Sequence, residues 1–414
     1  MRINFSIVKR NKLKIINDPV HGFIHIPNSL IFDLIEHPYF QRLRRITQMG
    51  LSYLVYPGAR HTRFQHALGC MHLMQKAVEN LRYKGIEISD KEAEGLYISI
   101  LLHDIGHGPF SHAMEHSIVS NIAHEEISLL FMQELNREFK GRLEVAIEIF
   151  KGSYPRKFLH QLISSQLDMD RSDYLKRDSF YTGVAEGNIN PERIISMLNV
   201  RNDELVVEEK GIYSVEKFLV ARRLMYWQVY LHKTSVAGEQ LLIRVLKRAK
   251  ELVKSGESLP MSNALLFFIQ NKINKQQFSK DILNKFALLD DTDIISAMKE
   301  WQFHPNFVLS KLSKMILNRD LPKVKLQNVP FDAEKTLILY EKVSSAYGIS
   351  KEEAAYFVFS DKISNTAYNA QQQTIHILTK KGKIIDVIKA SDQLNLEALS
   401  EPVVKHYLCY PKDV

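Results

Sequence analysis

The sequence predicts a mainly α-helical protein with a small α+β region at its C-terminal end. Apolar residues recur at helical spacing through most of the first 320 positions. After "NRDLPKVKLQNVPFD" the pattern changes to short runs rich in β-branched and aromatic residues, separated by turn signals. The 414 residues are 45% hydrophobic and 25% charged, as in ordinary globular proteins. We therefore expect a helical domain over residues 1–320 and an α+β region over residues 321–414.

The N-terminal elements follow from periodicity and from helix stop and start signals. "IFDLIEHPYFQRLRRITQMG" has helical spacing, with Pro38 placed to start a second helix that runs to Gln48. The next helix is expected after Thr62, a candidate N-cap, and before Gly85. "DKEAEGLYISILLHDIGHGPF" is apolar on nearly every side, as in a buried helix, and its Gly and Pro residues end it.

The later elements are predicted in the same way. The segment from Asp203 to Ser214 predicts a hairpin with its turn near Gly211, and Lys381-Gly382 predicts a turn between two C-terminal strands. Further helices are expected over residues 124–139, 142–150, 156–178 and 215–254.

Composition restricts the cellular setting. The net charge of +8 is compatible with a phosphate-bearing ligand but does not by itself indicate one. The two cysteines, Cys70 and Cys409, form no zinc-ribbon spacing or disulfide framework, which favours a reducing compartment. The N-terminus does not resemble a signal peptide, and no apolar run approaches the ~18 residues of a membrane span. We expect a soluble cytoplasmic protein without a membrane partner.

The stretch "LLHDIGHGPFSH" concentrates histidines beside an aspartate where a buried helix is expected to end. Buried ionisable groups are costly unless they are paired or bind a metal. The C-terminal end of a helix also favours a cation. His103 and Asp104 are therefore candidate metal ligands, although a His–Asp ion pair would also satisfy this dipeptide.

Two other segments carry residues of the same chemical kind. His66 lies beside Gly69 and Cys70 on a helix face of small residues, where a second helix can approach closely. In "SQLDMDRSDYLKRD", Asp170 is a further carboxylate, and Asp173 and Arg177 have the spacing of a solvated ion pair.

His66, His103-Asp104 and Asp170 match the H…HD…D signature of HD-domain metal-dependent phosphohydrolases. The segments "NDPVHGFI", "FQRLRRITQMG", "YPGARHTRFQHALG", "LLHDIGHGPFSHAMEH", "HEE" and "DMDRSDYLKRD" follow in the order seen in deoxynucleoside triphosphate triphosphohydrolases. The chain thus resembles the dGTPase-like members of that family over roughly residues 15–240. The sterile-alpha-motif domain of the vertebrate member has no counterpart in this sequence.

The resemblance implies one divalent metal ion, held by the four signature residues. Two imidazoles and two carboxylates suit Mn, Fe, Ni, Zn or Mg better than calcium or copper(I). Such an ion activates water and acts as a Lewis acid on phosphorus.

The resemblance also implies hydrolysis at the α-phosphorus of a deoxynucleoside triphosphate, dGTP being one candidate, with release of inorganic triphosphate. His112 is the expected proton donor to the departing 5′ oxygen. The other residues that match the family's catalytic cluster are His107, Glu115 and His124.

Substrate contacts carry over by position. Gln48 and Asp178 match residues that bind the sugar 3′ hydroxyl, and Tyr174 matches a residue that leaves no room for a 2′ hydroxyl. The remaining matches are the phosphate-binding Arg63, Arg171 and Arg222, and Tyr230, which stacks near the base. Two positions depart from the family pattern: Arg171 replaces the vertebrate lysine, which puts phosphate geometry in doubt, and Tyr226 replaces a usual histidine, which puts local recognition in doubt.

Glu36, Gln41 and Arg44 match the region where the vertebrate enzyme binds a regulatory guanine nucleotide, with glutamate here in place of aspartate. A regulatory nucleotide and assembly into a homo-dimer or homo-tetramer are expectations by analogy. A basic surface helix is the plain alternative.

Two other functions are compatible with these residues. One is an HD-type phosphodiesterase or nuclease acting on other phosphate esters, which the presence of Gln48, Tyr174 and Asp178 disfavours. The other is a catalytically silent, regulatory protein that binds nucleic acid, supported only by the net charge of +8 and by basic stretches. The presence of all four signature residues disfavours a silent protein.

Overall fold

The computed structural model describes residues 14–110, 119, 122–369, 373–392 and 396–414. Within these ranges the chain is mainly helical, with three small β-sheets, so the predicted fold class is confirmed. No helix in these ranges combines the length and apolar character needed to cross a bilayer.

The first described element is an antiparallel hairpin that hydrophobic periodicity did not predict. Pro38 is the first residue of its helix, as predicted, but that helix ends at Gln41 rather than Gln48. A 3₁₀ turn follows because the side chain of Arg42 is buried and bonds to distant carbonyl oxygens. The elements are β1 (Ile15–Asp18), β2 (Gly22–His25), α1 (Ser29–Glu36), α2 (Pro38–Gln41), η1 (Arg42–Arg45) and η2 (Gly50–Leu54).

The next two helices are α3 (Arg63–Tyr83) and α4 (Asp90–Leu102). Thr62 caps α3 as predicted, and Ser89 caps α4; each forms a capping box with the residue three positions on. Gly85 follows α3 with φ +84°, a conformation that favours glycine.

One expected helix, over residues 156–178, is two helices. The chain breaks at residues 164–168, where the Asp168 side chain accepts a hydrogen bond from the backbone N–H of Arg171 and starts a new helix. The elements of this region are α6 (His124–Glu138), α7 (Glu144–Phe150), α8 (Lys157–Ile163), α9 (Met169–Thr182), η3 (Ala185–Gly187) and α10 (Pro191–Met197).

The predicted hairpin exists, but its turn does not lie near Gly211. Strands β3 (Leu198–Arg201) and β4 (Glu204–Glu208) are joined at Asn202 and Asp203, with φ +54° and +61°. Asn and Asp tolerate this left-handed conformation, which tight hairpin turns require. Gly211 instead stands directly before a helix.

The expected helix over residues 215–254 is interrupted by a π-helical turn, η5 (Tyr226–Tyr230). Such turns occur frequently at functional sites. The elements are η4 (Glu209–Gly211), α11 (Ile212–Met225), η5, α12 (Lys233–Lys254), α13 (Asn263–Gln270), η6 (Lys275–Gln277), α14 (Lys280–Phe286), α15 (Asp291–Trp301) and α16 (Phe307–Leu317).

The C-terminal region contains the two strands predicted around Lys381-Gly382, with Gly382 in the turn at φ +75°. The strand-like stretch over residues 354–361 becomes a strand only from Phe359. Its sheet has the order β5-β9-β6, and β7 joins the earlier hairpin by pairing parallel to β4. The elements are β5 (Lys323–Gln327), α17 (Ala333–Tyr347), α18 (Lys351–Ala354), β6 (Phe359–Asn365), β7 (His376–Leu378), β8 (Ile384–Asp386), α19 (Val387–Ala390), α20 (Glu397–Ser400) and β9 (Val403–Tyr410).

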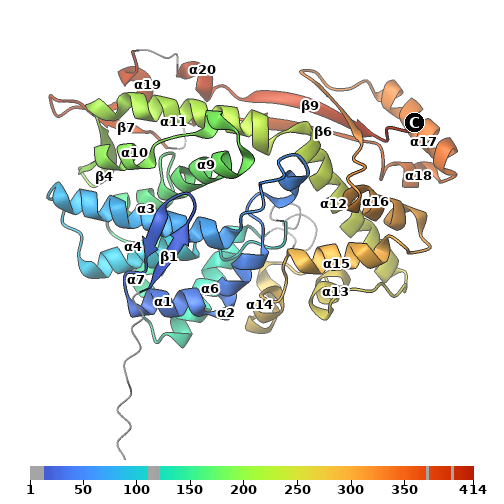
Figure 1. The fold of residues 1–414 in the computed structure, drawn as a ribbon, viewed down its shortest axis with the longest axis horizontal. Coiled ribbons are helices and arrows are strands. Elements are labelled where there is room, and N and C mark those ends of the chain that lie inside the picture. The colour runs from blue at the N-terminus through green and yellow to red at the C-terminus, as the bar shows by residue number, and fades with distance from the viewer. Residues whose placement is uncertain (1–13, 111–118, 120–121, 370–372, 393–395) are drawn as a thin grey trace, which may run out of the picture.

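A continuous apolar core, extending from Ile24 to Tyr410, connects these elements. Helices α13 to α16 gather on one side of the molecule, and α11 and β9 run along its upper edge in Figure 1. Helix α3 packs against both α4 and α9. This packing brings together the three segments that carry the predicted metal ligands.

Candidate active site

Helices α3 and α9 approach each other closely at Gly69. A Cβ atom at this position would lie 2.0 Å from Asp173 Oδ1 on α9, so a larger residue would separate α3 from α9. The close helix approach that the small residues beside His66 predict is therefore present.

The four predicted metal ligands converge at this point. Asp170 Oδ1 lies 3.1 Å from His66 Nε2 and 3.5 Å from His103 Nε2. Asp104 Oδ2 lies 3.7 Å from His66 Nε2, and Asp104 Oδ1 lies 3.4 Å from His103 Nε2. Because ligand atoms bind such ions at about 2.0–2.2 Å, these separations fit atoms that share one ion. His66, Cys70, His103 and Asp170 form one group whose ligand atoms lie within 4.8 Å of one another, and Asp104 forms a second such group with His107 and His124.

The imidazole tautomers also fit a metal site. His103 donates its Nδ1–H to the Ile100 carbonyl oxygen at 2.6 Å, and His66 donates its Nδ1–H to Asp173 at 2.8 Å. Each Nε2 therefore faces the carboxylates. Among the described residues, the buried His103 Nε2 has no hydrogen-bond partner, as expected for an atom that binds a cation.

The charges of the four residues depend on one another. Burial alone would raise the pKa values of Asp170 and Asp104, but the neighbouring imidazoles, with Arg63 at Asp104, hold both well below the ordinary range. Burial alone would lower the pKa of His103, but Asp104 and Asp170 raise it. The site thus holds two ionised carboxylates, Asp104, which is buried, and Asp170, whose side chain is 28% exposed, and together they attract protons or a cation.

Cys70 is a neighbour of this cluster that spacing did not single out as a ligand. Its Sγ lies 3.5 Å from His66 Nδ1 and 3.6 Å from His66 Nε2. Burial raises the pKa of the Cys70 thiol, which keeps it protonated.

His107 and His124 form a second histidine pair beside Asp104. Their rings stack with centroids 3.8 Å apart, and His107 Nε2 lies 3.4 Å from Asp104 Oδ1. Burial, and then the charge of Arg63, lower the pKa of His107 well below the ordinary value, so its imidazole is neutral at pH 7. His112 and Glu115 lie outside the described residues.

A cavity of about 490 Å³ opens beside these residues. Asp104, Asp170, His107 and His124 line it, together with Glu125, which the sequence analysis missed although it belongs to the "HEE" segment. The predicted substrate residues that line it are Gln48, Arg63, Arg171, Tyr174, Asp178 and Tyr230. Arg222 is outside the lining and donates to Gln166 Oε1 at 3.0 Å.

Asp178 is fixed by partners on both of its oxygens. Its Oδ1 lies 2.7 Å from His61 Nε2, and its Oδ2 accepts a hydrogen bond from the Tyr230 hydroxyl at 2.7 Å. His61 in turn stacks on Tyr181. His61 was not among the predicted site residues, because the "GARHTRF" segment contains no spacing signal that links it to a residue more than 100 positions away.

The prediction that Asp173 and Arg177 form a solvent-exposed ion pair is wrong. Both side chains are fully buried, and they do not form a solvated ion pair. Helical spacing alone predicts that they share a face, but it does not show that the N-terminal hairpin covers that face.

The predicted regulatory residues lie apart from the cavity lining. Glu36 is exposed at the end of α1. Gln41 donates to the Ile35 carbonyl oxygen and accepts from Arg44 Nε, each at 2.8 Å.

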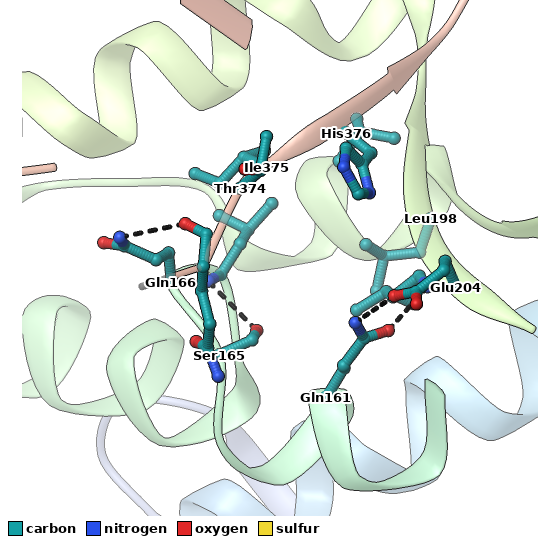
Figure 2. A pocket seen from close by; sticks show the side chains of 12 residues that line it. Gln161, Ser165, Gln166, Leu198, Glu204, Thr374, Ile375 and His376 are labelled. Atoms are coloured by element: carbon teal, nitrogen blue, oxygen red, sulfur yellow. Dashed lines mark hydrogen bonds between the residues drawn. The ribbon is translucent and has the colours of Figure 1, made fainter. Parts of the chain in front are cut away.

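A second cavity, of about 240 Å³, lies where the chain before β7 covers the β3–β4 hairpin. Figure 2 shows Gln166 on one side and the Gln161–Glu204 contact on the other. Gln166 Nε2 donates to the Asn369 and Gln373 carbonyl oxygens at 2.7 and 3.1 Å. Gln166 therefore connects Arg222 to the C-terminal region.

Known proteins resemble this chain over most of its length. The HD domain model matches residues 63–178, and the HD associated region matches residues 189–263. YwfO of Bacillus subtilis is 33% identical over 422 residues, covering 98% of this chain and 94% of YwfO. The deoxynucleoside triphosphate triphosphohydrolase SAMHD1 homolog of Dictyostelium discoideum is 28% identical over 390 residues, covering 84% of this chain and 75% of that protein.

A solved structure shares the whole architecture. The crystal structure of a phosphohydrolase from Bacteroides thetaiotaomicron has a TM-score of 0.94 and 54% sequence identity, with coverage of 97% of this chain and 100% of that one. The chain therefore belongs to the family of HD-domain phosphohydrolases that includes YwfO and the SAMHD1-like proteins.

Proposed function

We propose that this protein is a metal-dependent hydrolase that converts deoxynucleoside triphosphates into deoxynucleoside and inorganic triphosphate. One observation carries the proposal: the carboxylates of the metal cluster line the same cavity as two arginines and the Asp178–Tyr230 pair. A site of this kind can hold phosphates at one end and a sugar at the other. The name of the D. discoideum relative supports the same substrate class.

His66, His103, Asp104 and Asp170 would hold one divalent ion, for which Mn, Fe, Ni, Zn and Mg are candidates. Bound there, the ion supplies Lewis-acid polarisation of the phosphoryl group and activation of water.

The residues of the chain would supply the remaining functions. Arg63 and Arg171 neutralise charge on the phosphoryl oxygens. Water attacks the α-phosphorus, the bond to the 5′ oxygen breaks, and His112 gives that oxygen its proton. Neutral His107, with His124 and Glu115, orients the phosphates and moves protons. Arg222 would contact the phosphates only after its hydrogen bond to Gln166 breaks.

Sugar recognition would come from the other end of the cavity. Asp178 and Gln48 accept and donate hydrogen bonds at the 3′ hydroxyl, and Tyr230 lies beside the base. The ring of Tyr174 packs against Tyr230 with centroids 6.0 Å apart, and in this proposal it would exclude a 2′ hydroxyl.

We also propose a cytoplasmic location, in keeping with two buried free thiols, Cys70 and Cys409. Assembly into a homo-dimer or homo-tetramer, and activation by a nucleotide at Glu36, Gln41 and Arg44, stay predictions.

Product analysis tests the proposed reaction. Purified protein is incubated with Mn²⁺ or Mg²⁺ and each dNTP, each NTP, a chromogenic phosphodiester or single-stranded DNA, with and without added GTP. Ion-exchange chromatography and ³¹P NMR identify the products. We expect deoxynucleoside and inorganic triphosphate in equal amounts. Release of inorganic phosphate, cleavage of the phosphodiester or DNA, or binding of nucleic acid without turnover would each contradict the proposal.

Substitution of Tyr174 tests sugar selection. Tyr174→Ala is expected to raise kcat/KM for an NTP, relative to the dNTP of the same base, by about tenfold, because steric exclusion in a pocket contributes factors of this size. Phe180→Ala is the control, since Phe180 lies on the same helix but is 57% exposed. An unchanged ratio in Tyr174→Ala would remove Tyr174 from sugar selection.

A further inference from the structure

The N-terminal "DPVHG" turn connects β1 and β2 and packs behind the metal cluster. The Asp18 carboxylate closes the turn by accepting hydrogen bonds from the backbone N–H groups of Val20 and His21, at 3.0 and 2.9 Å. Strand β2 packs against α3, the helix that carries His66 (Figure 1). The turn thereby places the fully buried His21 side chain beside α9.

Asp173 on α9 receives hydrogen bonds from three different elements. Its Oδ1 accepts from His21 Nε2 at 2.7 Å and from Arg177 Nη2 at 3.0 Å. Its Oδ2 accepts from His66 Nδ1 and from Arg177 Nε, both at 2.8 Å. Four donors leave this buried carboxylate no freedom to rotate.

Arg177 completes the arrangement by bonding back to the turn. Its Nη1 donates to Asp18 Oδ2 at 2.8 Å, and its Nη2 lies 3.3 Å from Asp18 Oδ1. Asp173 therefore binds the Nε/Nη2 edge of the guanidinium and Asp18 binds the adjacent Nη1/Nη2 edge, so the two carboxylates share Nη2 of a side chain that is 0% exposed. Gly69 allows this close packing, since its missing Cβ would collide with Asp173.

This network of hydrogen bonds fixes the orientation of the His66 ring. A carboxylate that accepts the Nδ1–H of an imidazole fixes both the tautomer and the ring orientation, and it makes the other nitrogen a better ligand. His66 Nε2 then points to Asp170, 3.1 Å away.

We propose that Asp173 is a positioning residue for His66, and that His21, with the Asp18–Arg177 pair, makes the N-terminal turn a working part of the metal centre. This inference rests on the proposed function only in taking His66 as a metal ligand. It gives the "DPVHG" segment a physical role beyond marking the family.

Metal affinity tests the inference independently of turnover. Co²⁺ is titrated into metal-free full-length protein, its dissociation constant is measured by calorimetry, and its d–d absorption spectrum is recorded. We expect Asp173→Asn and His21→Ala to weaken Co²⁺ binding by about 10–100-fold, the usual range for such supporting residues. The spectrum should also change. His21→Gln keeps an N–H donor near the position of His21 Nε2 and should restore most of the affinity.

Two control variants separate positioning from folding. Ile24→Ala removes a fully buried side chain from the same hairpin, and Gln75→Ala removes the 3.0 Å bond that Gln75 donates to the His25 carbonyl oxygen. Both should lower the melting temperature and leave Co²⁺ affinity and spectrum unchanged. If Asp173→Asn does not fold, His21→Ala carries the test, since Arg177 still pairs with Asp173.

The possible results are distinct. Unchanged affinity in both Asp173→Asn and His21→Ala, with wild-type protein binding Co²⁺, would overturn the inference and leave the proposed function in place. Equal weakening of Co²⁺ binding in Ile24→Ala would also overturn the inference, because the effect would then come from loss of hairpin stability and not from the positioning of His66. Failure of the wild-type protein to bind Co²⁺ or Mn²⁺ would overturn both.

Discussion

Asp170→Asn is expected to abolish metal binding and to lower kcat by about 10³-fold or more. Asp170 Oδ1 is the carboxylate oxygen that faces both His66 Nε2 and His103 Nε2, at 3.1 and 3.5 Å. The substitution keeps the shape of the side chain but removes the negative charge that, on the proposed assignment, would hold the ion. A metal ion contributes several kcal/mol of charge stabilisation to the transition state, and about 4 kcal/mol corresponds to 10³ in rate.

Metal content by mass spectrometry and steady-state kinetics measure this effect. Asp90→Asn is the matched control, because the Asp90 side chain is 99% exposed and lies at the N-terminal end of α4, opposite the end that carries His103. Chelation of the wild-type protein should reproduce the loss, and added Mn²⁺ should reverse it. Full metal content or near-normal kcat in Asp170→Asn would refute the ligand assignment.

Local chemistry explains why much of the fold could be predicted. Thr62 and Gln65 form a capping box within four residues, and Pro38 starts a helix wherever its ring fits the first turn. The ligand set was predictable for another reason, since His66, the His103-Asp104 pair and Asp170 match a family signature. Their geometric convergence required the folded chain.

The misassigned features depend on contacts between distant segments. Arg42 turns a predicted helix into a 3₁₀ segment by bonding to Ile105 and His107, more than 60 positions away. Asp173 looked solvated because the hairpin that covers it lies about 150 positions earlier. Neither contact leaves a periodic trace in the sequence.

The π-helical turn at Tyr226–Tyr230 is a further feature, close to the site, that periodicity could not predict. Periodicity predicts a continuous helix there, but the extra residue in the turn coincides with the positions that face the cavity. Tyr226 and Tyr230 both line that cavity and pack against each other with centroids 5.1 Å apart. The departure of Tyr226 from the family pattern therefore lies at the surface that would meet a substrate.

Arg42→Met is expected to lower the free energy of unfolding by about 3 kcal/mol or more. The fully buried guanidinium donates to the carbonyl oxygens of Ile105, His107 and Leu289 at 2.8, 2.9 and 3.1 Å. Methionine fills a similar length but leaves all three oxygens without this donor. Each buried acceptor that loses its partner costs about 1–3 kcal/mol. Thermal and urea unfolding, followed by circular dichroism, measure the change.

The same substitution should also reduce turnover, because Arg42 fixes the backbone at His107 beside the metal cluster. Arg45→Met is the matched control: it lies in the same 3₁₀ segment, but its side chain is 53% exposed, and it pairs with the buried carboxylate of Asp290. Asp290 keeps the hydrogen bond that it accepts from the Thr292 backbone N–H, so Arg45→Met should cost less stability than Arg42→Met and leave kcat intact. If both variants lose equal stability, the effect belongs to the 3₁₀ segment as a whole, and the loop that carries His107 is held by other contacts.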